Sequence, residues 1–284
     1  MFPPRLSHAA CCALLGVVLV AMPANAQTVF QAAGVNAAGI QTVVDAFRTA
    51  VGPLNSNVAG SFGSGRREIN WDGVPDSFAA PNALPGNFFN VNSPRGVVLS
   101  TPGTSLQVSA NGSSSAAVEF GNIDASYSSA FTAFSALRLF ASIGSNITDV
   151  NFFMPGSTTA ATTNGFGVVF TDVDLAATTS LQFFDAFGSS LGIFFAPNLA
   201  GSGSLSFLGV QFAAGIGASR VRITSGNAAL AAGVIDGGGV DVVAMDDFIF
   251  AEPIAPQVVP EPATLALLAG GLGLLGVARS CRRA

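Results

Sequence analysis

Two pairs of carboxylates in this chain have residue types and a spacing that could support chemistry. Asp172 and Asp174 follow an alternating apolar segment, and the adjacent Asp246 and Asp247 lie inside another. Neighbouring carboxylates repel one another, and sites that offer only oxygen ligands suit Ca²⁺. These four residues are therefore candidate ligands of a structural Ca²⁺, with solvated carboxylates at strand ends as the alternative. Because successive side chains of a strand alternate between its faces, we expect at most one of Asp246 and Asp247 to point inward.

No catalytic apparatus is expected in the exported part of the chain. The only histidine is His8 and the three cysteines are Cys11, Cys12 and Cys281. All lie in segments that export should remove, which leaves no Ser-His-Asp triad, Cys-His pair or imidazole and thiolate metal site. The segment 188–192 matches the pattern G-x-S-x-G, but it has no base and falls in a predicted hairpin. We predict a protein without enzymatic activity; a glycoside hydrolase or lyase that uses two carboxylates is the alternative.

One aromatic side chain is a candidate ligand contact. Trp71 lies in the segment 55–104, which is rich in Gly, Pro, Asn and Ser, and it follows Arg66 and Arg67 closely. A tryptophan in such a loop could stack on a sugar ring. The alternative is a buried tryptophan that fastens the loop to the rest of the domain.

The segment 27–259 has the length and composition of one all-β domain. A single helix is predicted over 36–51, where apolar residues such as Ile40 and Phe47 recur at helical spacing. From 105 to 250, short alternating segments separated by turns predict about nine or ten strands. The predicted fold is an antiparallel, jelly-roll-like β-sandwich with this one N-terminal helix. Phenylalanine, with 24 residues, is expected to supply most of the core.

The N-terminal segment is typical of an export signal. Arg5 precedes an apolar stretch over 9–21, and Ala24 and Ala26 form a small-x-small site for signal peptidase. We therefore expect cleavage after Ala26. An uncleaved anchor is the alternative, but the apolar stretch is short for a membrane span.

The C-terminal segment combines a Pro-Glu-Pro triplet, an apolar run over 263–278 and a basic end. As a helix the run would be about 24 Å long, against roughly 30 Å for the hydrocarbon core of a bilayer. It is therefore short for a permanent anchor, although an ordinary tail anchor is the alternative. The basic end would stay in the cytoplasm and leave the domain outside. The residues that define this segment are Pro260, Glu261, Pro262, Arg279, Arg282 and Arg283.

This combination resembles the PEP-CTERM sorting signal of Gram-negative bacteria, in the form VPEPATLALLAGGLGLLG followed by the arginines. The resemblance covers the last 26 residues. It implies recognition by exosortase, a transpeptidase-like membrane enzyme, followed by removal of the tail and release or attachment at the cell surface. It also implies an association with exopolysaccharide production.

The charge of the segment 27–259 limits its partners. Seven arginines and fifteen acidic residues give it a formal net charge of −8. Such a domain repels nucleic acid and anionic membrane surfaces, so membrane contact is expected only through the C-terminal helix before processing. We predict a protein exported across the inner membrane to the cell surface or the extracellular space. Its expected role is structural or adhesive in exopolysaccharide or biofilm, and a carbohydrate-binding jelly-roll module is the alternative.

The predicted organisation of the chain has five parts. They are a signal peptide over 1–26, an N-terminal helix with an irregular cover region over 27–104, the β-sandwich core over 105–250, a Pro-rich spacer over 251–258, and the sorting signal over 259–284.

Overall fold

The computed structural model describes residues 27–113 and 115–256. The predicted signal peptide with Ala24 and Ala26, and the predicted sorting segment with its triplet and arginines, lie outside the described residues. Within those residues, no helix has both the length and the apolar character needed to span a membrane.

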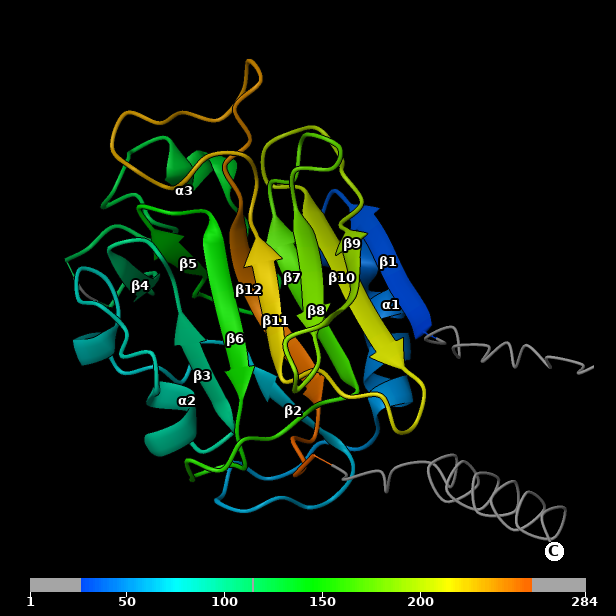
Figure 1. The fold of residues 1–284 in the computed structure, drawn as a ribbon. Helices are drawn as coiled ribbons and strands as arrows, with labels where there is room; N and C mark the ends of the chain where they lie inside the picture. The colour runs from blue at the N-terminus through cyan, green and yellow to red at the C-terminus, as the bar shows by residue number, and fades with distance from the viewer. Residues whose placement is uncertain (1–26, 114, 257–284) are drawn as a thin grey trace, which may run out of the picture.

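The described chain forms two antiparallel sheets, with seven and five strands, that pack face to face (Figure 1). This confirms the predicted all-β class, and three short helical segments in the described chain add to the single helix that the sequence predicted. The strands are β1 (Gln27–Gly34), β2 (Arg66–Ile69), β3 (Val97–Ser100), β4 (Ser105–Val108), β5 (Phe140–Ile143), β6 (Ile147–Phe152), β7 (Gly165–Thr171), β8 (Ser180–Phe184), β9 (Ser190–Phe195), β10 (Leu205–Phe212), β11 (Arg220–Thr224) and β12 (Ala244–Ala251). The helices are α1 (Ala37–Val51), η1 (Asp76–Phe78), α2 (Phe88–Val91) and α3 (Tyr127–Ala130).

Strand order places β12 inside the larger sheet. That sheet runs β1-β10-β7-β12-β5-β4, and β2 also pairs with β12; the smaller sheet runs β3-β6-β11-β8-β9. Strands β1, β2 and β3 come from the segment 27–104, which was expected to hold a helix and irregular cover, so the sheets draw on more of the chain than 105–250. The strand β1 escaped prediction because it is half-exposed and its polar, alanine and glycine residues do not alternate clearly.

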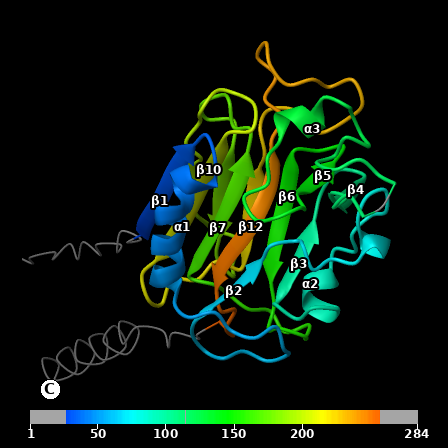
Figure 2. The ribbon, with the colours of Figure 1, turned by 180° about the vertical axis from the view of Figure 1, so that it is seen from behind.

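Helix α1 confirms the helix predicted over 36–51. The side chain of Asn36 caps its start by accepting a hydrogen bond from the Gly39 amide at 3.3 Å. Its apolar face packs on the outer face of the larger sheet, against β1, β10 and β12, as the view from behind shows (Figure 2). The ring of Phe47 fits there because Gly167 of β7 and Gly209 of β10 have no side chains; a Cβ at either would lie 2.9 Å from that ring.

The space between the two sheets is filled mainly by phenylalanine, as the composition predicts. Phe166 and Phe248 of the larger sheet and Phe183 of the smaller one are fully buried in this core. Their ring contacts are edge-to-face or tilted, with Phe166 and Phe248 5.5 Å apart. Such contacts stabilise the core in addition to the stabilisation that comes from the large apolar area each ring removes from water.

A buried ion pair lies at the C-terminal end of β12. Arg67 of β2 donates two hydrogen bonds of 2.8 Å to the carboxylate of Glu252, and both side chains are buried. The remaining guanidinium donors bind the carbonyl oxygens of Val58, Gly60 and Pro94. All five donors of this arginine are therefore satisfied by the protein.

We predict that Gly209→Ala destabilises the domain by about 1–3 kcal/mol, because the added methyl group would collide with Phe47 and force α1 away from the sheet. Gly73→Ala is the matched control, since its Cβ would meet no atom within 4 Å. The measurement is the free energy of unfolding in denaturant. Equal stability of the two variants would contradict the packing argument.

We also predict that Glu252→Gln costs about 3–5 kcal/mol, because it leaves the buried charge of Arg67 without a counter-charge. Asp45→Asn removes the same charge from an exposed pair with Arg48 and should change stability little, since Asp45 is 57% exposed. Denaturant unfolding of both variants makes the comparison. If Glu252→Gln lowers the free energy of unfolding no more than Asp45→Asn does, the buried ion pair contributes no more to stability than a surface pair.

Candidate metal centre

Three carboxylates meet at one end of the sandwich. Asp172 and Asp174 follow β7, and Asp236 lies in the loop 225–243 between β11 and β12, which rises above the sheets in Figure 1. One oxygen from each carboxylate lies within 4.8 Å of the other two. The structure therefore brings together two predicted ligands and adds Asp236, which sequence reasoning missed. The acid followed by three glycines at 236–239 is the pattern that could have marked it.

Asp172 is the buried member of this cluster. It is 0% exposed, and neither of its carboxylate oxygens has a hydrogen-bond partner among the described residues. Its backbone is left-handed, with a φ of 69°, a conformation that aspartate tolerates at some cost. Burial, followed by the nearby carboxylates of Asp236 and Asp174, raises the pKa of Asp172 to about 8, and the nearby backbone amide of Gly203 opposes this increase.

The other two carboxylates are each held by one backbone amide. Asp174 Oδ1 accepts a hydrogen bond of 2.9 Å from the Gly201 amide, and Asp236 Oδ1 accepts one of 3.0 Å from the Val242 amide. Asp241 fixes the backbone at Asp174, because its Oδ1 accepts a hydrogen bond of 3.0 Å from the Asp174 amide. Burial raises the pKa of Asp236, and the Val242 amide opposes that shift. The arrangement offers a set of oxygen atoms suited to a hard cation.

Asp246 and Asp247 do not point to opposite faces, and that expectation was wrong. Ser135 Oγ lies 3.1 Å from Asp246 Oδ1 and 2.8 Å from Asp247 Oδ1. The pairing of β12 with β7 shifts its register between Met245 and Phe248. This irregularity breaks the regular alternation of the strand and turns both carboxylates toward one serine.

Donors of the protein occupy the oxygens of this second pair. Asp246 Oδ2 accepts hydrogen bonds from the amides of Phe134 and Ser135, at 2.6 and 3.1 Å. Asp247 Oδ2 accepts one of 3.2 Å from Arg48, which also binds Glu68. The converging group of three described acids does not include Asp246 or Asp247. They form a separate, internally satisfied pair beneath α1.

Burial raises the pKa of both members of the pair. For Asp246 the pKa lies well above its ordinary value of 3.8, because of desolvation first and the neighbouring Asp247 carboxylate second. For Asp247 desolvation also dominates, and the hydrogen bond from Ser135 and the charge of Arg48 oppose it. Glu68, which faces Asp247 across Arg48, adds to the increase. Two adjacent buried carboxylates of this kind share protons as one titrating unit.

Trp71 is buried, which corrects its prediction as a sugar-stacking residue. It is 1% exposed, and its ring stacks on Phe140 with the centroids 4.2 Å apart. Its Nε1 donates a hydrogen bond of 2.7 Å to the carbonyl oxygen of Asp246. The alternative interpretation holds, because Trp71 fastens its loop to the centre of β12 and offers no face to a ligand.

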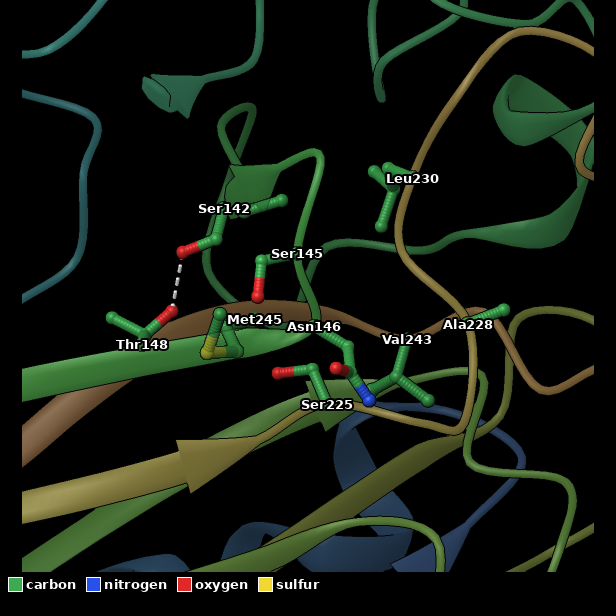
Figure 3. Close-up of a pocket in the computed structure, with 10 residues that line it drawn as sticks. Ser142, Ser145, Asn146, Thr148, Ser225, Ala228, Leu230, Val243 and Met245 are labelled. Atoms are coloured by element: carbon green, nitrogen blue, oxygen red, sulfur yellow. Dashed lines mark hydrogen bonds between the residues drawn. The ribbon is translucent and has the colours of Figure 1, made fainter. Parts of the chain in front are cut away.

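The described residues line one small cavity and one groove of note. The cavity in Figure 3 has a volume of about 10 Å³, and the hydroxyls of Ser142 and Thr148 lie 2.6 Å apart in its wall. It has room for a single water molecule and is too small for a sugar.

The groove, of about 770 Å³, lies at the end of β7 opposite Asp172. Its lining includes Asn164, Asp185, Phe187, Leu191, Gln211 and Pro256.

The outer face of the smaller sheet presents three rows of side chains. They alternate with core residues along each strand, and the strand register aligns them across the sheet. The rows are Val98, Asn151, Arg220 and Phe184; Ser100, Asp149, Arg222, Gln182 and Ile193; and Ile147, Thr224, Ser180 and Phe195.

Charged and aromatic groups on this face are held in fixed positions. Arg220 and Arg222 both donate to Asp149 Oδ1 at 2.9 Å, and the Arg220 guanidinium lies 3.7 Å from the centre of the Phe184 ring. Phe195 is 46% exposed. Helix α1 contacts strands of the larger sheet, and among the described helices none lies over this outer face in Figure 1.

Comparison with known proteins concerns the C-terminal segment. Residues 258–283 match the family model of the PEP-CTERM protein-sorting motif. The match includes the triplet, the apolar run and the arginines named above, so the predicted sorting signal is confirmed. A search of curated proteins finds no match for the chain.

We predict that Asp246→Asn reduces the pH dependence of stability. Because the pKa is raised in the folded state, the native protein keeps a proton that the unfolded chain has lost, so stability falls as pH rises above about 4. One such group contributes at most about 1.4 kcal/mol per pH unit. The side chain of asparagine resembles the protonated acid, so the slope should decrease. The measurement is the unfolding free energy from pH 4 to 8 in the presence of chelator.

Asp45→Asn is the control for this experiment. It removes an exposed carboxylate of α1 outside the pair, so it should keep the wild-type dependence of stability on pH. An unchanged pH slope in Asp246→Asn would refute the role assigned to the pair.

Proposed function

We propose that this protein, which its sorting motif marks as exported and processed by exosortase, is a structural or adhesive component of an extracellular polysaccharide matrix. The motif implies passage across the membrane and a final location at the cell surface or outside the cell. The described sandwich is then the part that would meet the matrix.

The observation that carries the adhesive role is the outer face of the smaller sheet. It combines an arginine stacked on Phe184, a second arginine, the amides of Asn151 and Gln182, and the exposed ring of Phe195. Flat rings suit the apolar faces of sugars, and amide and guanidinium groups suit their hydroxyls. The strand register arranges these groups in three neighbouring rows across the sheet, which offers an extended polymer several contacts.

Charge favours the same face. Arg220, Arg222 and Asp149 give it an excess of one positive charge, on a segment whose formal net charge is −8. A polysaccharide with carboxylate or other anionic groups would be repelled by most of the domain and attracted to this surface.

A dedicated carbohydrate-binding module is the second candidate function, and the same face favours it. Such a module would prefer one sugar over others, whereas a structural matrix protein would retain polysaccharide without a sharp preference. A glycan array distinguishes the two. Neither role includes a catalytic step, and the buried positions of Asp246 and Asp247 support a function without turnover.

We predict that Phe195→Ala weakens the binding of exopolysaccharide from the producing bacterium by roughly tenfold, a loss equivalent to about 1.4 kcal/mol. The measurement is the binding isotherm of the purified protein on immobilised polysaccharide. Phe187→Ala is the matched variant, because Phe187 is 94% exposed and lines the groove. It should bind like the wild type. Loss of binding in Phe187→Ala alone would move the contact surface from the sheet to the groove.

A further inference from the structure

Among residues 27–113 and 115–256, no positive side chain forms an ion pair with Asp172, Asp174 or Asp236. The same is true of Asp241 among these residues. The second acidic pair differs in this respect, because Arg48 binds Asp247. Carboxylates that converge within 4.8 Å without a cation repel one another strongly in a partly buried setting.

Asp172 provides an independent indication of a ligand. Both of its oxygens are buried and have no hydrogen-bond donor among the described residues. Ionised, the side chain would be a buried charge without a partner. Protonated, it would still have one donor and its acceptor oxygens without partners. A cation bound between the three acids satisfies the oxygens that neither protonation state satisfies.

The donor set indicates which cation. Hydrogen bonds use one oxygen each of Asp174 and Asp236, so the cluster offers their second oxygens together with both oxygens of Asp172. All of these are hard oxygen ligands, which Ca²⁺ prefers. Ligands on opposite sides of one Ca²⁺, at about 2.4 Å each, stand about 4.8 Å apart. The observed convergence fits within that span.

We propose that Asp172, Asp174 and Asp236 bind one Ca²⁺, and that this ion fastens the loop 225–243 to the end of the sandwich. Asp172 and Asp174 lie directly after β7, whereas Asp236 belongs to the loop. Asp241 is a positioning residue: it holds the Asp174 amide and accepts a hydrogen bond from the Thr178 hydroxyl.

The ion would connect the stretch 235–240 of the loop to the sheets, because the hydrogen bonds of that stretch, among the described residues, lie within the loop: Asn227 Nδ2 donates to the Gly239 carbonyl oxygen at 2.9 Å and the Val242 amide donates to Asp236. Tyr127 of α3 donates to the Val234 carbonyl oxygen at 2.7 Å and accepts from the Ala231 amide at 3.2 Å. Beyond that point come Ile235, which is well exposed, and three consecutive glycines at 237–239 with positive φ. The bond from Asp236 to the ion would tie this second half to the sheet.

The experiment uses protein expressed from the full-length sequence and treated with chelator. Calorimetric titration with CaCl₂ should show one ion per chain, with the submillimolar to millimolar affinity of about 10⁻⁴–10⁻³ M that is usual outside cells. Ca²⁺ should raise the melting temperature, and EGTA should reverse the rise. Hydrogen exchange of the amides at 231–240 should slow in Ca²⁺, a readout specific to the loop.

Variants of the ligands test the assignment. Asp172→Asn should remain folded in EGTA, since it replaces a buried carboxylate by a neutral group of the same shape, and should lose the response to Ca²⁺. Asp236→Asn, at a partly exposed loop position, should lose it too and serves if Asp172→Asn fails to fold. Asp45→Asn, on the exposed surface of α1, is the matched control and should respond like the wild type.

Three results would overturn the proposal. They are a wild-type protein whose melting and hydrogen exchange do not respond to Ca²⁺, an Asp172→Asn or Asp236→Asn variant that keeps the full response, and an equal response to MgCl₂ at the same concentration. None of these measurements involves polysaccharide, so their outcome is independent of the proposed adhesive role.

Discussion

The ion pair between Arg67 and Glu252 determines how the irregular first third of the chain meets the sheets. A buried guanidinium is tolerated only if each of its donors finds an acceptor. Arg67 meets this requirement by drawing three loop carbonyl oxygens and one carboxylate to a single point. The pair thereby sets the pairing of β2 with β12, and the chain that continues from β2 brings Trp71 under the carbonyl of Asp246.

The two acidic groups show how one residue type takes different roles in different surroundings. Asp246 and Asp247 receive backbone amides, a serine hydroxyl and an arginine, and so form a closed set of interactions. Asp172 receives no hydrogen bond from the described residues. The first group is part of the scaffold that joins α1 to β12. The second has the character of a binding site, because both oxygens of Asp172 lack a hydrogen-bond partner in the part of the chain that the structure describes.

Local patterns made much of the structure predictable. The spacing of Ile40 and Phe47 predicted α1, the alternating segments predicted the all-β class, and the triplet with its arginines predicted the sorting motif. The features that the sequence did not predict depend on contacts between residues that are distant in the chain. The register shift that turns Asp246 and Asp247 to one side arises from pairing with β7. Asp236 joins Asp172 only because the loop between β11 and β12 returns to the end of β7, and no local spacing encodes that return.

The place of β12 in the larger sheet has a mechanical consequence. A protein attached by its C-terminal side would bear load where the chain leaves the domain, and here the chain continues from β12 and Glu252 to Ile254, which pairs with Thr162. Because β12 is bonded to β7 along one edge and to β5 and β2 along the other, a pull on it must strain ladders on both sides together. A pull on β1, which among the described strands is bonded to β10 alone, would strain one ladder. Tension applied at the C-terminal side of the domain would therefore meet more resistance than tension applied at β1.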